Sequence, residues 1–223
     1  MIKFRLRQTT PATNHTRPIA LEPLRLKAPH RPMRVLDIDT ESRPLHWITS
    51  DYMSQEITAM AWAWTDQPDD VTCYMLGDVD TPTMMGAFRA AYDQADMVTG
   101  HYITGHDLPL IQAMLTEYHL PLLSDTLVQD TKVHLVKRRG LSSSQENIAA
   151  MLLLEHDKVR MNQAKWRAAN RLTPEGKDES RKRVIGDVQQ HIEMRAKLLE
   201  LGYVSRHVKW KGGASAQVEA YTP

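Results

Sequence analysis

The sequence contains a single cysteine, Cys73, and no apolar run close to the roughly 20 residues that a membrane-spanning helix needs. One cysteine excludes an internal disulfide framework and is typical of a reducing compartment. The N-terminal segment lacks the apolar core of a secretory signal, and the chain contains no internal repeat. These absences predict a soluble cytoplasmic protein without a membrane partner. Its 223 residues suit one domain with some excess.

The net charge of +1 conceals an uneven distribution of charge along the chain. Residues 1–34 hold eight Lys and Arg against one acid, which leaves 20 basic and 26 acidic residues in the remainder. The same N-terminal segment is rich in proline and shows neither helical nor strand periodicity. We therefore predict a poorly ordered basic leader over residues 1–33, one domain over 34–203 and a C-terminal tail over 204–223.

Apolar periodicity divides the predicted domain into alternating strands and helices. Strands are expected near residues 33–42, 56–64, 71–76, 96–101 and 123–131, and helices near 81–95, 108–120, 145–154 and 174–201. Three strands in succession favour an antiparallel meander. The later alternation of strands and helices favours an α/β fold, with a mixed sheet flanked by helices.

The stretch MRVLDIDTES, residues 33–42, places Asp37, Asp39 and Glu41 at every second position. Side chains two apart in a strand lie on the same face, so these carboxylates would repel one another and raise one another's pKa. A solvated edge strand is the simplest explanation of alternating acids, but Val35, on the same face as the acids, and Ile38, between Asp37 and Asp39, are apolar. A divalent cation such as Mg²⁺ or Mn²⁺ would compensate the charge.

Two other acidic motifs can be compared with this strand. A calcium-binding EF-hand loop that begins at Asp37 needs glycine and glutamate where the chain has Ser42 and Ile48, which excludes it. The DxDx[TV] pattern of haloacid-dehalogenase-type phosphatases fails only at Glu41, and its later GDxxxD pattern fails only at His191. The phosphatase therefore stays open as a less favoured alternative.

A third comparison accounts for more of the chain. VLDIDT resembles the hhDIET motif that opens the DEDD superfamily of ribonuclease H-like 3′–5′ exonucleases, which are related to polymerase proofreading domains. VTGHYITGHDLPLI and KRVIGDVQQHIEMRAKLLE resemble the second and third motifs, in the same order and spacing. The resemblance covers roughly residues 34–201 and is closest to small stand-alone proteins of phage replication and repair.

The resemblance implies a ribonuclease H-like fold and hydrolysis at the 3′ end of single-stranded DNA or RNA, with a DNA polymerase as a candidate partner. It also implies two Mg²⁺ or Mn²⁺ ions held by four acids: Asp37, Asp39, Asp107 and Asp187. Family members carry a His or Tyr shortly before the last acid, where this chain has Lys182 and Arg183. We predict that His191, one helical turn after Asp187, acts as the catalytic base. Without a base, the alternative is a catalytically inactive nucleic-acid-binding module.

Basic residues crowd the approach to the third motif. For any one of them, a solvated helix face is the simplest explanation, but as a group beside an acidic site they would steer a polyanion. The predicted nucleic-acid contacts are Tyr102, Lys165, Arg167, Lys182 and Arg183. Trp166 could stack on a base or pack against a helix.

Overall fold

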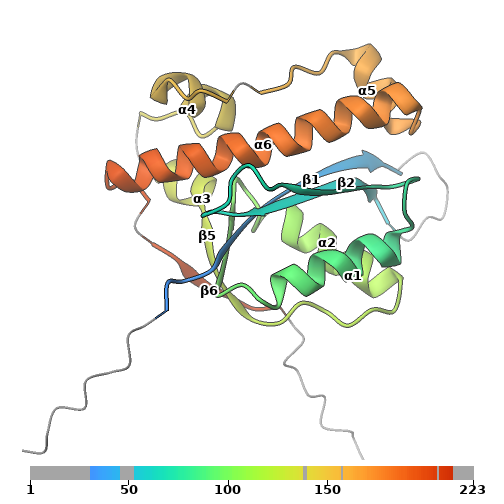
Figure 1. Cartoon of the computed structure of the whole chain (residues 1–223), viewed down its shortest axis with the longest axis horizontal. Coiled ribbons are helices and arrows are strands. Elements are labelled where there is room, and N and C mark those ends of the chain that lie inside the picture. The colour runs from blue at the N-terminus through green and yellow to red at the C-terminus, as the bar shows by residue number, and fades with distance from the viewer. Residues whose placement is uncertain (1–30, 46–52, 138–139, 157, 205, 213–223) are drawn as a thin grey trace, which may run out of the picture. The chain divides into compact units, whose positions relative to one another are not determined.

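The computed structural model describes residues 31–45, 53–137, 140–156, 158–204 and 206–212. The predicted leader, apart from its last three residues, lies outside the described residues. The described strands form one six-stranded sheet in the order β3-β2-β1-β4-β5-β6 (Figure 1). The strands are β1 (Val35–Pro44), β2 (Gln55–Trp64), β3 (Thr72–Met75), β4 (Met97–Gly100), β5 (Thr126–Asp130) and β6 (Val208–Trp210).

The sheet is mixed, as predicted. β1, β2 and β3 pair antiparallel, which forms the expected meander, whereas β1, β4 and β5 run parallel. β6 joins the edge antiparallel to β5, although the sequence predicted that the domain ends at residue 203. A three-residue strand carries too little apolar alternation to be recognised in the sequence.

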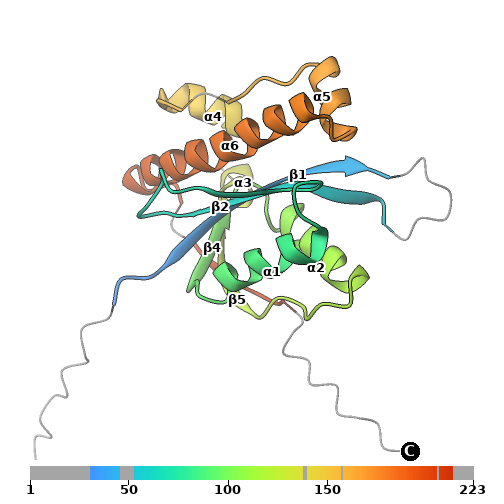
Figure 2. The same ribbon diagram turned by 45° about the vertical axis from the view of Figure 1, so that its right-hand side comes forward.

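Helices cover both faces of the sheet, as Figures 1 and 2 show from two directions. α1 (Thr81–Tyr92) and α2 (Asp107–Glu117) lie on one face, while the long helix α6 (Pro174–Glu200) lies on the other. α4 (Gln145–Leu152) and α5 (Gln163–Asn170) pack on the outer side of α6, and the short helix α3 (Thr131–Val136) follows β5. No helix in the described part of the chain is long and apolar enough to cross a bilayer.

Two apolar clusters hold these layers together. Leu36 and Ile38 of β1 point into the larger core, where they meet Phe88 of α1 and Ile111 of α2. On the opposite face, the alanines of β2 pack against α6 through Val184 and its neighbours one and two turns on. The alternation of β1 thus leaves its acids on the face that α6 covers.

The start of α6 follows the capping signals in the sequence. The Thr173 side chain accepts a hydrogen bond from the Gly176 N–H at 3.1 Å, and Pro174 occupies the first turn. A side chain at Gly176 would collide with the Ala168 carbonyl of α5, so glycine permits the close contact of the two helices. This junction fixes the register of the helix that carries Asp187.

Candidate active site

The acids of β1 face a row of small side chains. In the antiparallel pair with β2, Asp37 lies opposite Ala63, Asp39 opposite Ala61 and Glu41 opposite Ala59. The alanines leave room for α6 above the sheet. The register shifts between Glu41 and Ser42, so a β-bulge ends the alternation just after the last acid.

The position of each acid along β1 decides its surroundings. β4 pairs with β1 only as far as Asp37, which lies opposite Thr99. β4 then ends at Gly100 and β5 at Asp130. Asp39 and Glu41 therefore lie beyond the carboxyl ends of the parallel strands, where α/β sheets commonly bind ligands. Asp37 lies inside the paired region.

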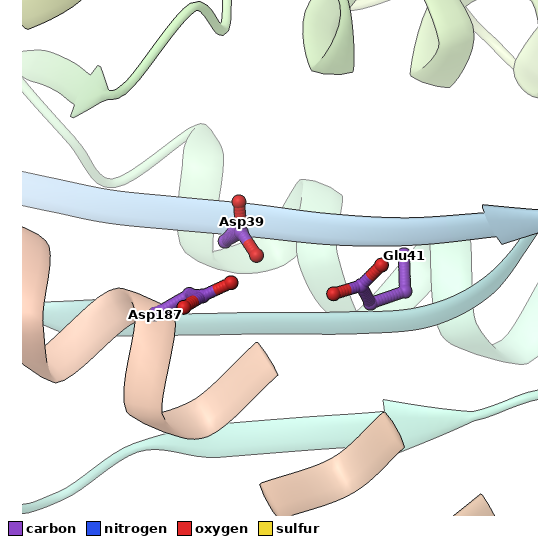
Figure 3. A group of neighbouring side chains, drawn as sticks. All are labelled: Asp39, Glu41 and Asp187. Carbon is purple, nitrogen blue, oxygen red and sulfur yellow. The ribbon is translucent and has the colours of Figure 1, made fainter. Parts of the chain in front are cut away.

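Three carboxylates converge at this edge of the sheet. Asp39 and Glu41 extend from β1 toward Asp187 of α6 (Figure 3), and one oxygen of each lies within 4.8 Å of the others. Burial raises the pKa of Asp39 well above its usual range, and the charges of Asp107, Asp187 and Glu41 raise it further. Burial likewise raises the pKa of Glu41 to about 7. The site therefore holds more negative charge than its surroundings compensate.

Asp107 supplies a fourth acid from the other side of β1. It is the first residue of α2, and its Oδ1 accepts hydrogen bonds from the Thr40 N–H at 3.0 Å and the Thr40 hydroxyl at 2.6 Å. Burial raises the pKa of Asp107, against the lowering effect of these bonds. Thr40 thus fixes Asp107 next to Asp39, and the charge of Asp107 raises the pKa of Asp39.

Two cations reach into the acidic group. Arg183 Nε donates to Glu41 Oε1, and Arg183 Nη2 lies 3.5 Å from Asp187 Oδ2. Lys158 Nζ lies 3.3 Å from the same Asp187 oxygen. Burial opposes the charge of Arg183, but Glu41 and Asp187 outweigh it and raise the pKa of the guanidinium. Two positive charges are therefore set against four carboxylates.

These groups share a cavity of about 280 Å³, here called the acid cavity. It is lined by Asp39, Thr40, Glu41, His101, Lys132, Ser144, Gln145, Lys158, Arg183 and Asp187. Carboxylate oxygens are the ligands that Mg²⁺ and Mn²⁺ prefer. Asp187 Oδ1 is buried without a hydrogen-bond partner among the described residues, so it is available to a ligand. The residues present fit a divalent cation.

Asp37, predicted as the first metal ligand, lies outside this group. Its side chain is 0 % exposed, and its Oδ2 lies 2.6 Å from Nδ1 of His191. Burial raises the Asp37 pKa, and the nearby His191 opposes this effect. The two residues form a buried pair beside the acid cavity. Asp37 is also the first residue of the phosphatase pattern, and its Oδ1, like Asp187 Oδ1, is buried without a hydrogen-bond partner among the described residues.

His191, the predicted base, does not line the acid cavity. Both of its ring nitrogens have protein partners, because Nε2 lies 2.9 Å from the Thr131 hydroxyl. That hydroxyl lies 2.9 Å from Nδ1 of His101, whose Nε2 lies 2.8 Å from the Ser143 carbonyl. Burial, together with the charge of His191, lowers the pKa of His101 to about 4, so the His101 ring is neutral near pH 7.

The Ser143 carbonyl, at the end of this hydrogen-bonded series, determines the tautomers of the histidines. The Ser143 carbonyl can only accept, so the neutral ring of His101 carries its hydrogen on Nε2 and accepts from Thr131 at Nδ1. The Thr131 hydroxyl then accepts from His191 Nε2. His191 Nδ1 lies 2.6 Å from Asp37 Oδ2 and ends this hydrogen-bonded series. Nothing in the local sequence pattern of His101 indicates that it lines the cavity.

The predicted nucleic-acid contacts lie in different places. Only Arg183 lines the acid cavity, where its guanidinium also lies 5.2 Å from the Trp166 ring centre, so Trp166 packs against the helix. Lys165 pairs with Glu179 at 2.7 Å, and Lys182 is exposed on α6. Arg167 lines a separate surface hollow along α5.

Tyr102 lies close to the acid cavity. It follows His101, is 43 % exposed and has a φ of 75°, which non-glycine residues seldom adopt. Its N–H donates to Asp130 Oδ1 at 3.0 Å. The ammonium of Lys132, which lines the cavity, lies 4.0 Å from the Tyr102 ring centre. An exposed ring is thus held in a strained conformation near the cavity.

The sequence matches no family model and no curated protein. Among solved structures, the fold is similar to the family B DNA polymerase from the hyperthermophilic archaeon Pyrobaculum calidifontis, with a TM-score of 0.60 and 16% sequence identity. The similarity covers 78% of this chain but only 25% of the polymerase, so the chain spans about a quarter of its length. This likeness concerns the fold alone. The chain has the predicted ribonuclease H-like α/β fold, a mixed sheet flanked by helices.

Proposed function

We propose that the protein is a metal-dependent 3′–5′ exonuclease that hydrolyses the phosphodiester bond at the 3′ end of single-stranded DNA or RNA. The observation that supports this most is the convergence of acids from β1, α2 and α6, with cations in the same cavity. Metal-dependent hydrolysis of a polyanion needs acids to bind the metal ions and positively charged side chains to bind the substrate phosphates.

The proposed ligand set is shifted by two residues from the one predicted from sequence. Asp39 and Glu41 replace Asp37 and Asp39, and Asp107 and Asp187 keep their roles. In this register the second acid is a glutamate, as in the motif that the strand resembles. Two Mg²⁺ or Mn²⁺ ions, when bound, would supply an activated water and stabilise the leaving 3′ oxygen.

The remaining residues would bind and orient the strand. Lys158 and Arg183 lie among the acids and can hold the oxygens of the scissile phosphate, while Lys132 adds positive charge at the cavity wall. Arg183 only donates, so it can orient the phosphate but cannot accept a proton from water. The exposed ring of Tyr102 offers a stacking surface for the terminal base.

A second candidate function is a nucleic-acid-binding module without catalysis. One observation favours it: Arg183 and Lys158 already pair with Glu41 and Asp187, two of the acids that a metal would need. If these pairs persist when nucleic acid binds, the acids position cations for phosphate instead of holding metal. Both candidates use the same cavity, and metal-dependent cleavage separates them.

The test is incubation of 5′-labelled single-stranded DNA and RNA oligonucleotides with Mg²⁺ or Mn²⁺, followed by gel electrophoresis. The exonuclease proposal predicts a ladder that shortens from the 3′ end and is abolished by Asp187→Asn. The matched control is Asp178→Asn, because Asp178 lies on the same helix but is exposed and pairs with Arg181. Retarded but intact oligonucleotides under all conditions would instead support the binding module.

A further inference from the structure

A second cavity adjoins the acid cavity and has no role in the account above. Its volume is about 470 Å³. It is lined by Glu146, Ala149, Ala150, Leu153, Leu154, His156, Lys158, Arg160 and Gln190. We propose that this cavity binds the nucleotide that precedes the scissile phosphate in a single-stranded substrate. The proposal rests on the proposed function and names where the substrate strand continues.

The two cavities share a wall. Lys158 lines both of them, and its ammonium lies 3.3 Å from Asp187 Oδ2 on the acidic side. Gln145 lines the acid cavity and donates to Gln190 Oε1 at 3.2 Å, while Gln190 lines the second cavity. A strand with its terminal phosphodiester among the acids would pass Lys158 to enter the second cavity.

The far wall of the second cavity is held in place by α6. The Glu193 carboxylate accepts the N–H groups of Glu155 and His156 at 2.9 and 3.2 Å. Glu193 also lies 2.9 Å from Nδ1 of His156, and Gln190 Nε2 donates to the His156 carbonyl at 2.7 Å. This preorganised segment carries Leu154 on one side and Lys158 on the other, so little ordering remains to occur when a ligand binds.

Leu153 points to a ligand through its conformation and exposure. It caps the C-terminus of α4 with φ 53° and ψ 49°, the left-handed conformation that glycine or asparagine usually supplies at this position. Its side chain is nevertheless 87 % exposed. A leucine here incurs backbone strain, which clusters at ligand sites, and its exposed apolar side chain lines the cavity.

The chemistry of the walls fits a nucleotide. Leu153, Leu154 and Ala149 give an apolar surface for a base. Lys158 and Arg160 give positive charge for a phosphate. Arg160 is exposed, so a phosphate can reach its guanidinium. Base stacking combined with backbone charge is how proteins hold single strands without reading sequence.

Leu153→Gly tests the proposal, because it should stabilise the fold while it weakens binding. A leucine with only a structural role would leave the affinity for the oligonucleotide unchanged. Relief of the left-handed strain should raise Tm by about 2–4 °C. Loss of the apolar wall should at the same time weaken binding of a fluorescent single-stranded oligonucleotide in EDTA about tenfold, for DNA and for RNA. Met151→Ala is the matched control, since Met151 is exposed on the same helix but does not line the cavity.

Arg160→Ala provides an independent arm. It should weaken binding and lower the slope of log affinity against log salt by about one. Unchanged affinity in both Leu153→Gly and Arg160→Ala would overturn the subsite. If the two variants weakened the affinity for DNA alone, or for RNA alone, the proposal of a site that binds either kind of single strand would be overturned.

A kinetic arm separates this proposal from the proposed function. The p-nitrophenyl ester of thymidine 5′-monophosphate has one nucleotide and reports on the acid cavity, whereas a dinucleotide also reaches the second cavity. Leu153→Gly should raise KM for the dinucleotide about tenfold relative to KM for the ester. An equal change for both substrates would overturn the subsite. If the wild type cleaves neither substrate, the exonuclease proposal fails, and the binding experiments in EDTA still decide the subsite.

Discussion

Replacement of Glu41 by Gln should make the metal-free protein more stable near neutral pH. Glu41 is 9 % exposed, and burial raises its pKa from 4.5 to about 7 despite the ion pair with Arg183. The folded protein therefore keeps a proton that the unfolded chain releases between these pH values. The free energy of unfolding falls as the pH rises through this window, and the loss is complete above pH 7.

The size of the effect follows from the pKa. Each tenfold change in an equilibrium is worth about 1.4 kcal/mol, so the rise in pKa corresponds to about 3 kcal/mol. Glu41→Gln removes this dependence while it keeps the shape of the side chain. The variant should equal the wild type near pH 4.5 and exceed its Tm by about 6–12 °C at pH 8.

The assay is thermal unfolding in EDTA at several pH values, repeated with Mn²⁺. Mn²⁺ should stabilise the wild type more than the variant, because a bound ion uses the charge that Gln lacks. Glu56→Gln is the control, since Glu56 also pairs with an arginine but is 18% exposed and lies outside the acid cavity. A Glu41→Gln variant less stable than the wild type at pH 8 in EDTA would show that the Arg183 pair outweighs burial and refute the reasoning.

Further predictions concern the neighbouring residues. Asp107→Asn should abolish metal-dependent cleavage while circular dichroism stays unchanged. His191→Ala leaves the Asp37 carboxylate buried without its partner and should cost about 3–5 kcal/mol in urea unfolding, and Asp37→Asn in the same chain should recover part of this loss. Tyr102→Ala should weaken oligonucleotide binding about 5- to 100-fold in fluorescence anisotropy. Deletion of residues 1–30 should leave Tm unchanged and flatten the salt dependence of DNA binding; an unfolded product would contradict the predicted boundary.

The sequence predicted the order of the main elements because their signals are local. Alternating apolar residues marked β2, and the pair Thr173 and Pro174 marked the start of α6. The shorter elements α3, α5 and β6 span between three and eight residues. None of these three is predicted from the sequence, although α4, which is also eight residues long and has Ser144 as its N-cap, is predicted.

The register of the acids could not be predicted in the same way. Asp37, Asp39 and Glu41 lie two apart, so either neighbouring pair satisfies an acid-x-acid motif on one strand face. The choice depends on where β4 stops pairing with β1, which is a tertiary property. The match of Asp37 to the hhDIET motif favours Asp37 and Asp39 as the first two ligands, whereas the acid cavity favours Asp39 and Glu41.

The cavity cations and His101 were missed for a related reason. Lys158 lies in a loop, distant in sequence from Asp187, and one lysine in a basic segment has no distinctive pattern. His101 reaches the cavity wall because the chain turns at the end of β4. Such placements follow from how the layers pack, whereas Asp107 and Asp187 belong to longer motifs and could be selected from the sequence.

The most direct test of the central claim is 3′-end shortening of a 5′-labelled single-stranded oligonucleotide with Mn²⁺, with the wild type run beside Asp39→Asn and Asp37→Asn. We expect the wild type to produce a ladder of single-nucleotide steps, Asp39→Asn to leave the oligonucleotide intact, and Asp37→Asn to retain cleavage, because Asn can still bond to His191. An intact oligonucleotide with the wild type, or cleavage by Asp39→Asn but not by Asp37→Asn, would contradict the account.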